Sequence, residues 1–235
     1  MSKRSDIIDG NRAVTEKYGL VYTELLGWID LGHAQGNDIR HLFSQISQGE
    51  ASGEEYYTIR YSQGMTGLLR QIRVGSVLTW QIRSGRDYFE RQRIALAMMM
   101  AVTHQFESFQ ASFPNKLVTD SGFSGEDLVS NLLGFYRVIS NYDPLLMLRP
   151  VSKEDALARW DYYGKIGNWK NKKFQPLLFP DPKKSIHRQP FLGELPEFMK
   201  RVVPYNNFFS DDVIRSGEND KKFMVLGAGS NRMGL

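Results

Sequence analysis

The sequence contains no cysteine among its 235 residues. It therefore has no disulfide, no thiolate metal site and no cysteine nucleophile. Long apolar runs are also missing, since the longest, residues 94–102, has nine residues and is about half as long as a membrane span. Residues 1–9 have no apolar stretch of the kind that a signal peptide needs. We expect a chain without a transmembrane segment, cytoplasmic as synthesised, whose export would use a route without a signal peptide.

A large excess of charge of one sign is missing too. Lys and Arg total 30 against 26 for Asp and Glu, a net charge of +4, and the basic residues are scattered. A small and scattered excess argues against nucleic acid as a partner. The sequence also lacks the His-Glu-x-x-His, paired-cysteine and Asp-x-Asp patterns of common metal sites, and the Gly-x-Ser-x-Gly elbow of many hydrolases.

What is present favours a packed core. Hydrophobic residues make up 41% and aromatic residues 12% of the chain, and no linker divides it, so we expect a single globular domain over 1–235 with a loop-rich C-terminal third (about 164–235). Alternation between residues 55 and 82 predicts a small β-hairpin or sheet. The expected helices are 9–31, 37–46, 86–112, 128–140, 152–163 and 195–202. The predicted class is α+β, predominantly helical, with a central buried helix around 94–102.

Two pairs of polar residues interrupt apolar segments. Asp30 and His33 lie three residues apart, as do His104 and Glu107, and this spacing places each pair on one helix face. An acid beside a histidine fixes the imidazole tautomer for proton transfer or metal binding. The competing interpretation is that His33 lies at a helix C-terminus against the dipole, that Asp30 caps a turn, and that His104 and Glu107 lie where the helix reaches solvent.

A third polar group follows Ser124. Glu126 and Asp127 are most simply first-turn acids favoured by the helix dipole, with Asn131 one turn beyond Asp127. A zinc or iron site built from His33, His104 and one carboxylate is geometrically possible, so a divalent metal stays open as the cofactor.

Two segments carry a resemblance to a known family. Residues 27–33, Gly-Trp-Ile-Asp-Leu-Gly-His, and 123–134, Phe-Ser-Gly-Glu-Asp-Leu-Val-Ser-Asn-Leu-Leu-Gly, resemble a bacterial family catalogued as domain of unknown function 4056. Members carry these segments in this order with a His-Glu helix between them, whereas Gln105 follows His104 here. The resemblance covers roughly residues 20–140. It implies no activity, but it does imply that the three segments meet in space.

Together these residues predict a hydrolase-like domain. We expect Asp30, His33, His104, Glu107 and Asp127 to line one cleft, with His33 as base or ligand, Asp30 orienting it and Glu107 as general acid. Glu107-Ser108 resembles the Glu-Ser pair of lytic transglycosylases, without the residues that normally follow. The expected setting is an antibacterial effector toxin acting on cell-envelope peptidoglycan, with a secretion or cognate immunity partner. The alternatives are a metal-dependent hydrolase and a non-catalytic binding or adaptor protein with a buried polar network.

Overall fold

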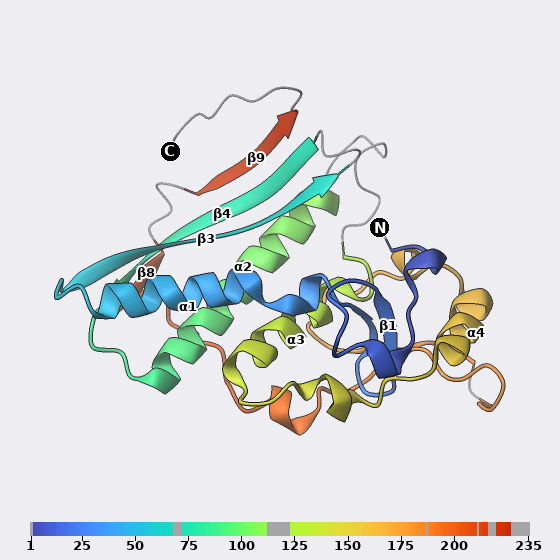
Figure 1. The fold of residues 1–235 in the computed structure, drawn as a ribbon. Coiled ribbons are helices and arrows are strands. Elements are labelled where there is room, and N and C mark those ends of the chain that lie inside the picture. Colours follow the sequence, from blue (N-terminus) through green and yellow to red (C-terminus); the bar gives the residue numbers. More distant parts are fainter. Residues whose placement is uncertain are drawn as a thin grey trace.

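The computed structural model describes residues 2–67, 72–111, 123–186, 188–210, 212–215 and 220–226. Within them, a long twisted hairpin lies over two helices, and a second, smaller sheet lies on the far side of a third helix (Figure 1). The α-helices in these ranges are α1 (Asn37–Glu50), α2 (Tyr88–Ala111), α3 (Asp127–Ile139) and α4 (Lys153–Tyr163). Short 3-10 turns cover Arg4–Asp6, Gly10–Arg12, His33–Gln35, Pro144–Leu148, Ile166–Asn168 and Glu197–Met199.

The larger sheet is built on the hairpin of β3 (Tyr56–Gly67) and β4 (Ile72–Arg83). Strand β4 also pairs with β8 (Val213–Arg215) and with β9 (Lys221–Leu226), and β8 pairs with β7 (Phe209–Ser210). Alternate residues point to one face of a strand. The cross-strand partners Tyr57–Ile82, Ile59–Trp80 and Tyr61–Leu78 are accordingly all buried. This face is part of the main core, to which α1, α2 and α3 also contribute.

The smaller sheet has the order β1 (Leu20–Thr23), β2 (Gly27–Asp30), β5 (Leu177–Leu178) and β6 (Phe191–Leu192). The prediction of a helix over 9–31 was wrong, because β1 and β2 form a hairpin there. The Thr23 hydroxyl closes its turn, accepting from the Leu26 N–H (3.1 Å) and donating to the Gly27 carbonyl (3.2 Å). Gly27 has φ +72°, which does not fit a right-handed helix. All four β1 residues are buried, so the strand lacks the alternation that identifies half-buried strands.

The expectation of a predominantly helical domain with a small hairpin was therefore wrong. The chain is an α+β mix with two sheets, and each hairpin strand in the larger sheet has 12 residues. The expected loop-rich C-terminal third supplies β5 to β9, and the expected helix 195–202 is only the 3-10 turn Glu197–Met199, between Pro196 and Pro204. Sequence reasoning missed these strands because several are only two or three residues long.

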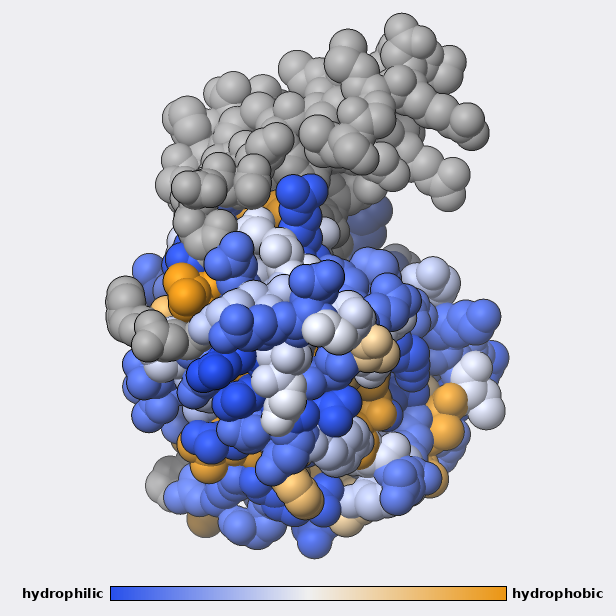
Figure 2. Space-filling view, turned by 90° about the vertical axis from the view of Figure 1, so that its left-hand side faces the viewer, coloured by the Kyte–Doolittle hydropathy of each residue, from blue (hydrophilic) through white to orange (hydrophobic). Residues whose placement is uncertain are grey.

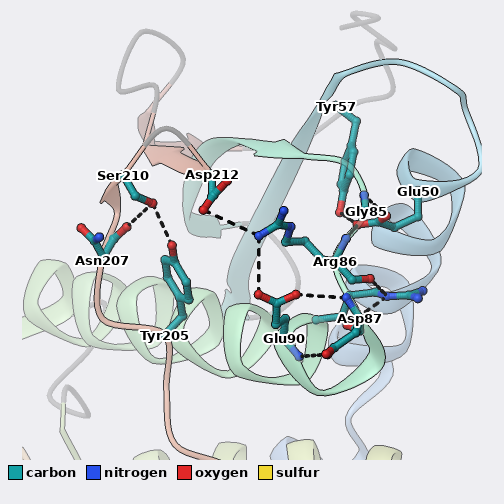
Figure 3. A network of polar contacts seen from close by, with 11 residues as sticks. Glu50, Tyr57, Gly85, Arg86, Asp87, Glu90, Tyr205, Asn207, Ser210 and Asp212 are labelled. Carbon is teal, nitrogen blue, oxygen red and sulfur yellow. Dashed lines mark hydrogen bonds and ion pairs between the residues drawn. The ribbon is translucent and has the colours of Figure 1, made fainter.

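A polar network links the open end of the β3–β4 hairpin to α1 and α2 (Figure 3). The Glu50 carboxylate at the end of α1 accepts from the Tyr57 hydroxyl (2.8 Å) and from the backbone N–H groups of Gly85 (2.7 Å) and Arg86 (3.3 Å). Burial, followed by the bond to Glu50, raises the pKa of Tyr57. The Arg86 guanidinium lies 3.5 Å from Glu90 and 3.7 Å from Asp212. These contacts join α1, the hairpin and α2, so the network helps to hold the fold together.

Two further observations concern the surface and membranes. The face shown in Figure 2 is mostly hydrophilic where its residues are described, with hydrophobic side chains only in scattered places. Single exposed hydrophobic residues of this kind are normal and do not mark a docking surface. Among the residues described, no helix is both long enough and apolar enough to span a bilayer.

Candidate active site

Asp30 stands at the end of β2, and its carboxylate is held by the turn that follows. Oδ1 accepts from the backbone N–H of Gly32 (2.7 Å) and, more weakly, of His33 (3.4 Å). This is the usual arrangement in which an aspartate closes a turn on its own backbone. Oδ2 has no hydrogen-bond partner in the part of the chain that the structure describes. One carboxylate oxygen therefore fixes the side chain and leaves the other available.

Glu126 immediately precedes α3 and points inward. The residue is only 2% exposed. Its Oε1 accepts from the Ser2 hydroxyl (2.8 Å), and its Oε2 accepts from the Ser124 hydroxyl. Glu126 makes no side-chain cap of α3, and no Lys, Arg or His within the described ranges pairs with it. Burial of a carboxyl group is costly unless it is hydrogen-bonded. The two serine hydroxyls offset this cost for Glu126, and they also fix the orientation of its carboxyl group.

Ser130 on α3 connects the two acids. Its hydroxyl accepts from the backbone N–H of Asp30 (3.0 Å), and its own N–H donates to the carbonyl of Glu126 (2.9 Å). One turn further along α3, Gly134 packs against Gly36, where a Cβ on Gly36 would overlap the Gly134 carbonyl oxygen. The segments 27–36 and 123–134 are therefore in direct contact.

A groove of about 430 Å³ lies in front of Asp30. The N-terminal segment, dark blue in Figure 1, runs past β1 and supplies one wall of it. The lining residues are Ser2, Ser5, Asp6, Ile8, Tyr18, Gly19, Leu20 and Asp30. Ser2 both lines the groove and donates to Glu126, so Glu126 lies directly behind that wall. The groove thus has the carboxylates of Asp6 and Asp30 on its surface and that of Glu126 behind a serine hydroxyl.

The predicted histidines are placed differently from Asp30. His33 is exposed at the start of the turn His33–Gln35, and it meets the Asp30 carboxylate through its backbone N–H. Hydrogen bonds from its ring to Asp30 are absent from the described structure, so the expected orientation of the imidazole by Asp30 is not seen. His104 is also exposed, although the helix before it is buried. Its ring packs edge-on against Phe123, with ring centres 5.3 Å apart.

Segment 123–134 therefore touches both of the other two segments, residues 27–33 through Asp30 with Ser130 and α2 through His104 with Phe123. The three segments of the family resemblance do not share the groove as expected: of Asp30, His33, His104 and Asp127, Asp30 alone is among its lining residues. Asp127 is buried as the first residue of α3, with Asn131 half-buried one turn later. The side chain of Glu107, expected to be the general acid, lies outside the described residues.

Glu126 is the residue that the sequence interpretation undervalued. The sequence pattern indicates most simply an acid of the first helical turn, favoured by the helix dipole. In the structure every residue from Phe123 to Ser130 is buried. The signal that pointed to this was Ser124, a second polar residue two positions away that can bond the carboxyl group inside an apolar setting.

The described residues contain no group of three His, Asp or Glu side chains close enough together to hold a metal ion. Comparison of the chain with family models, with curated proteins and with solved structures finds no match.

Proposed function

We propose that the protein is a hydrolase of a bacterial cell-envelope polymer, peptidoglycan, and that Asp30 and Glu126 are its acid and base. The observation behind this proposal is that Ser2 contacts both acids' surroundings. Ser2 lines the groove together with Asp30, and its hydroxyl donates a hydrogen bond to Glu126. Hydrolases that use two carboxyl groups as acid and base keep them in unlike surroundings. Here Glu126 is 2% exposed between two serines, and Asp30 is half-buried, with Oδ2 unbonded among the described residues.

The chemistry assigns one role to each carboxyl group. Glu126 acts as the acid and gives a proton to the oxygen of the leaving group when the scissile bond breaks. Asp30 Oδ2 takes a proton from the attacking water, whose oxygen bonds to the reacting carbon. The Ser2 hydroxyl donates a hydrogen bond to Oε1 of Glu126 and so lies between this oxygen and the groove. For Glu126 to give its proton to the leaving group, the Ser2 side chain must rotate away or its hydroxyl must relay the proton. The N-terminal segment is therefore a working part of the proposed site.

The cell-envelope target rests on the resemblance of residues 27–33 and 123–134 to a bacterial family. An antibacterial effector role, with secretion and immunity partners, belongs to the same proposal.

The experiment uses purified protein on isolated peptidoglycan, together with protein directed to the periplasm of a bacterial host by an added signal sequence. We expect the wild type to release soluble fragments and to lyse cells, and Glu126→Gln and Asp30→Asn each to lower fragment release by about 100-fold or more. The matched control is Glu154→Gln, an acid whose side chain is 85% exposed and is not a lining residue of the groove. Inactive wild type, or full activity in both variants, would refute the proposal.

A non-catalytic binding protein is the second candidate. It is favoured by the observation that both oxygens of Glu126 are hydrogen-bonded and that Asp30 Oδ1 closes a turn, as in a structural network. Stability separates the candidates. A structural network would lose about 1 to 3 kcal/mol of unfolding free energy in Glu126→Gln, whereas an active-site carboxyl group is often replaced at little or no cost.

A further inference from the structure

We infer that the groove binds the uncharged sugar residues of a glycan strand, with Tyr18 as the surface on which a sugar ring stacks. This inference rests on the proposed function and names its substrate: the glycan of the cell wall and not the peptides attached to it. It is carried by three features of the groove, namely an exposed aromatic ring, a neighbouring carboxylate acceptor and the charge of the lining.

The aromatic ring is that of Tyr18, which is 73% exposed although it lines the groove. Exposure of this much aromatic surface forgoes the stabilisation that burial would give. A sugar ring has an apolar face of C–H groups that covers such a surface, while its hydroxyl groups stay at the edge to form hydrogen bonds. A peptide stem has no comparable rigid apolar face.

The carboxylate acceptor lies beside the ring. Gly32 separates the two groups, since a Cβ at this glycine would be 3.0 Å from Asp30 Oδ1 and 3.5 Å from Cδ1 of Tyr18. A sugar stacked on Tyr18 would thus bring its edge hydroxyls close to Asp30, whose Oδ2 has no hydrogen-bond donor within the described residues. Aromatic stacking and hydrogen bonding to a carboxylate are both available within one sugar residue.

The charge of the lining selects against anions. The groove has two acids, Asp6 and Asp30, two serines and no basic residue among its described lining residues. Like charges at close range are unfavourable, so carboxylate-bearing peptides and phosphate polymers are disfavoured. The volume of about 430 Å³ is at the small end of ligand pockets, which is enough for about one or two sugar residues. An N-acetylated amino sugar satisfies all three features.

The test measures binding by calorimetry in the Glu126→Gln background, so that hydrolysis does not consume the ligand. The probes are a tetramer of N-acetylglucosamine, which is neutral, and oligogalacturonate, which is anionic. We expect the neutral tetramer to bind and the anionic oligomer not to bind. Tyr18→Ala is expected to raise the Kd for the tetramer about 10-fold or more, the equivalent of about 1.4 kcal/mol, whereas Tyr18→Phe keeps the ring and stays within about 3-fold.

Two more variants sharpen the result. Gly32→Ala removes no group but places a methyl between Asp30 and Tyr18, so it also weakens binding. Tyr162→Ala removes a half-exposed tyrosine of α4 that is not among the groove's lining residues, and leaves the Kd unchanged. Equal affinity of Tyr18→Ala and wild type, or preference for the anionic oligomer, overturns the inference.

The outcomes separate this inference from the proposed function. Tyr18-dependent binding of the neutral tetramer, without release of fragments from peptidoglycan by the wild type, supports the glycan subsite and refutes the hydrolase. Fragment release that depends on Glu126 but is unaffected by Tyr18→Ala supports the hydrolase and refutes the subsite.

Discussion

Gly36→Ala is the sharpest test of the contact that brings the two site segments together. Gly36 has φ +67°, in the left-handed region, where an L-residue costs about 1 to 2 kcal/mol. Its added Cβ would also overlap the Gly134 carbonyl oxygen and lie 2.7 Å from Val138 Cγ2. Overpacking of this kind costs about 1 to 3 kcal/mol more. We therefore expect a loss of about 2 to 5 kcal/mol of unfolding free energy.

The matched control for this variant is Gly53→Ala. Gly53 has φ +79°, but a Cβ there meets nothing within 4 Å, so only the backbone strain of about 1 to 2 kcal/mol remains. Urea unfolding followed by tryptophan fluorescence measures both variants, and their difference isolates the steric part. If Gly36→Ala were no less stable than Gly53→Ala, the turn His33–Gln35 would not pack on α3 as closely as described.

Three further predictions concern other groups. Glu50→Ala leaves the buried Tyr57 hydroxyl and two backbone N–H groups without their acceptor, and should lower the unfolding free energy by about 2 to 4 kcal/mol in urea titration; wild-type stability would show that the network of Figure 3 is incidental. His33→Ala should release fragments from peptidoglycan at a rate within a few-fold of wild type, because the His33 ring does not contact Asp30 in the described structure. Loss of this activity would indicate that His33 is the base. Burial raises the pKa of Tyr22 to about 12, and since its ordinary value is 10, the stability that it contributes is complete below pH 10 and declines as pH rises through 12. Tyr22→Phe should flatten that decline in alkaline unfolding followed by circular dichroism, and an unchanged slope would contradict the assignment.

Helices with clear end signals were predictable from the sequence. The Ser152 hydroxyl accepts from the Asp155 N–H (3.1 Å) at the start of α4, as the Ser-Lys-Glu-Asp pattern indicates. The apolar run 94–102 lies inside α2. In both cases the determining interactions are local, within four residues along the chain.

Elements fixed by distant contacts were not predictable. The apolar residues between 14 and 29 fit a helical period, yet β1 and β2 pair with each other, and β2 pairs with Leu177 of β5, about 150 residues away. The burial of Glu126 depends likewise on Ser2, which is 124 positions away in sequence. Asp30 lies at a contact between two segments, but the groove in front of it requires the fold of the N-terminal segment.

The pairing of β4 at both of its edges has a consequence for the nascent chain. One edge of β4 pairs with β3 as soon as the hairpin forms, but the other edge stays unpaired until β8 and β9, at residues 213–226, have been synthesised. At about 5 to 20 residues per second, a ribosome needs on the order of ten seconds to supply them. An open strand edge pairs readily with other chains during such an interval. Chains that end before residue 213 should therefore aggregate during synthesis, even though they carry Asp30, Glu126 and the whole groove.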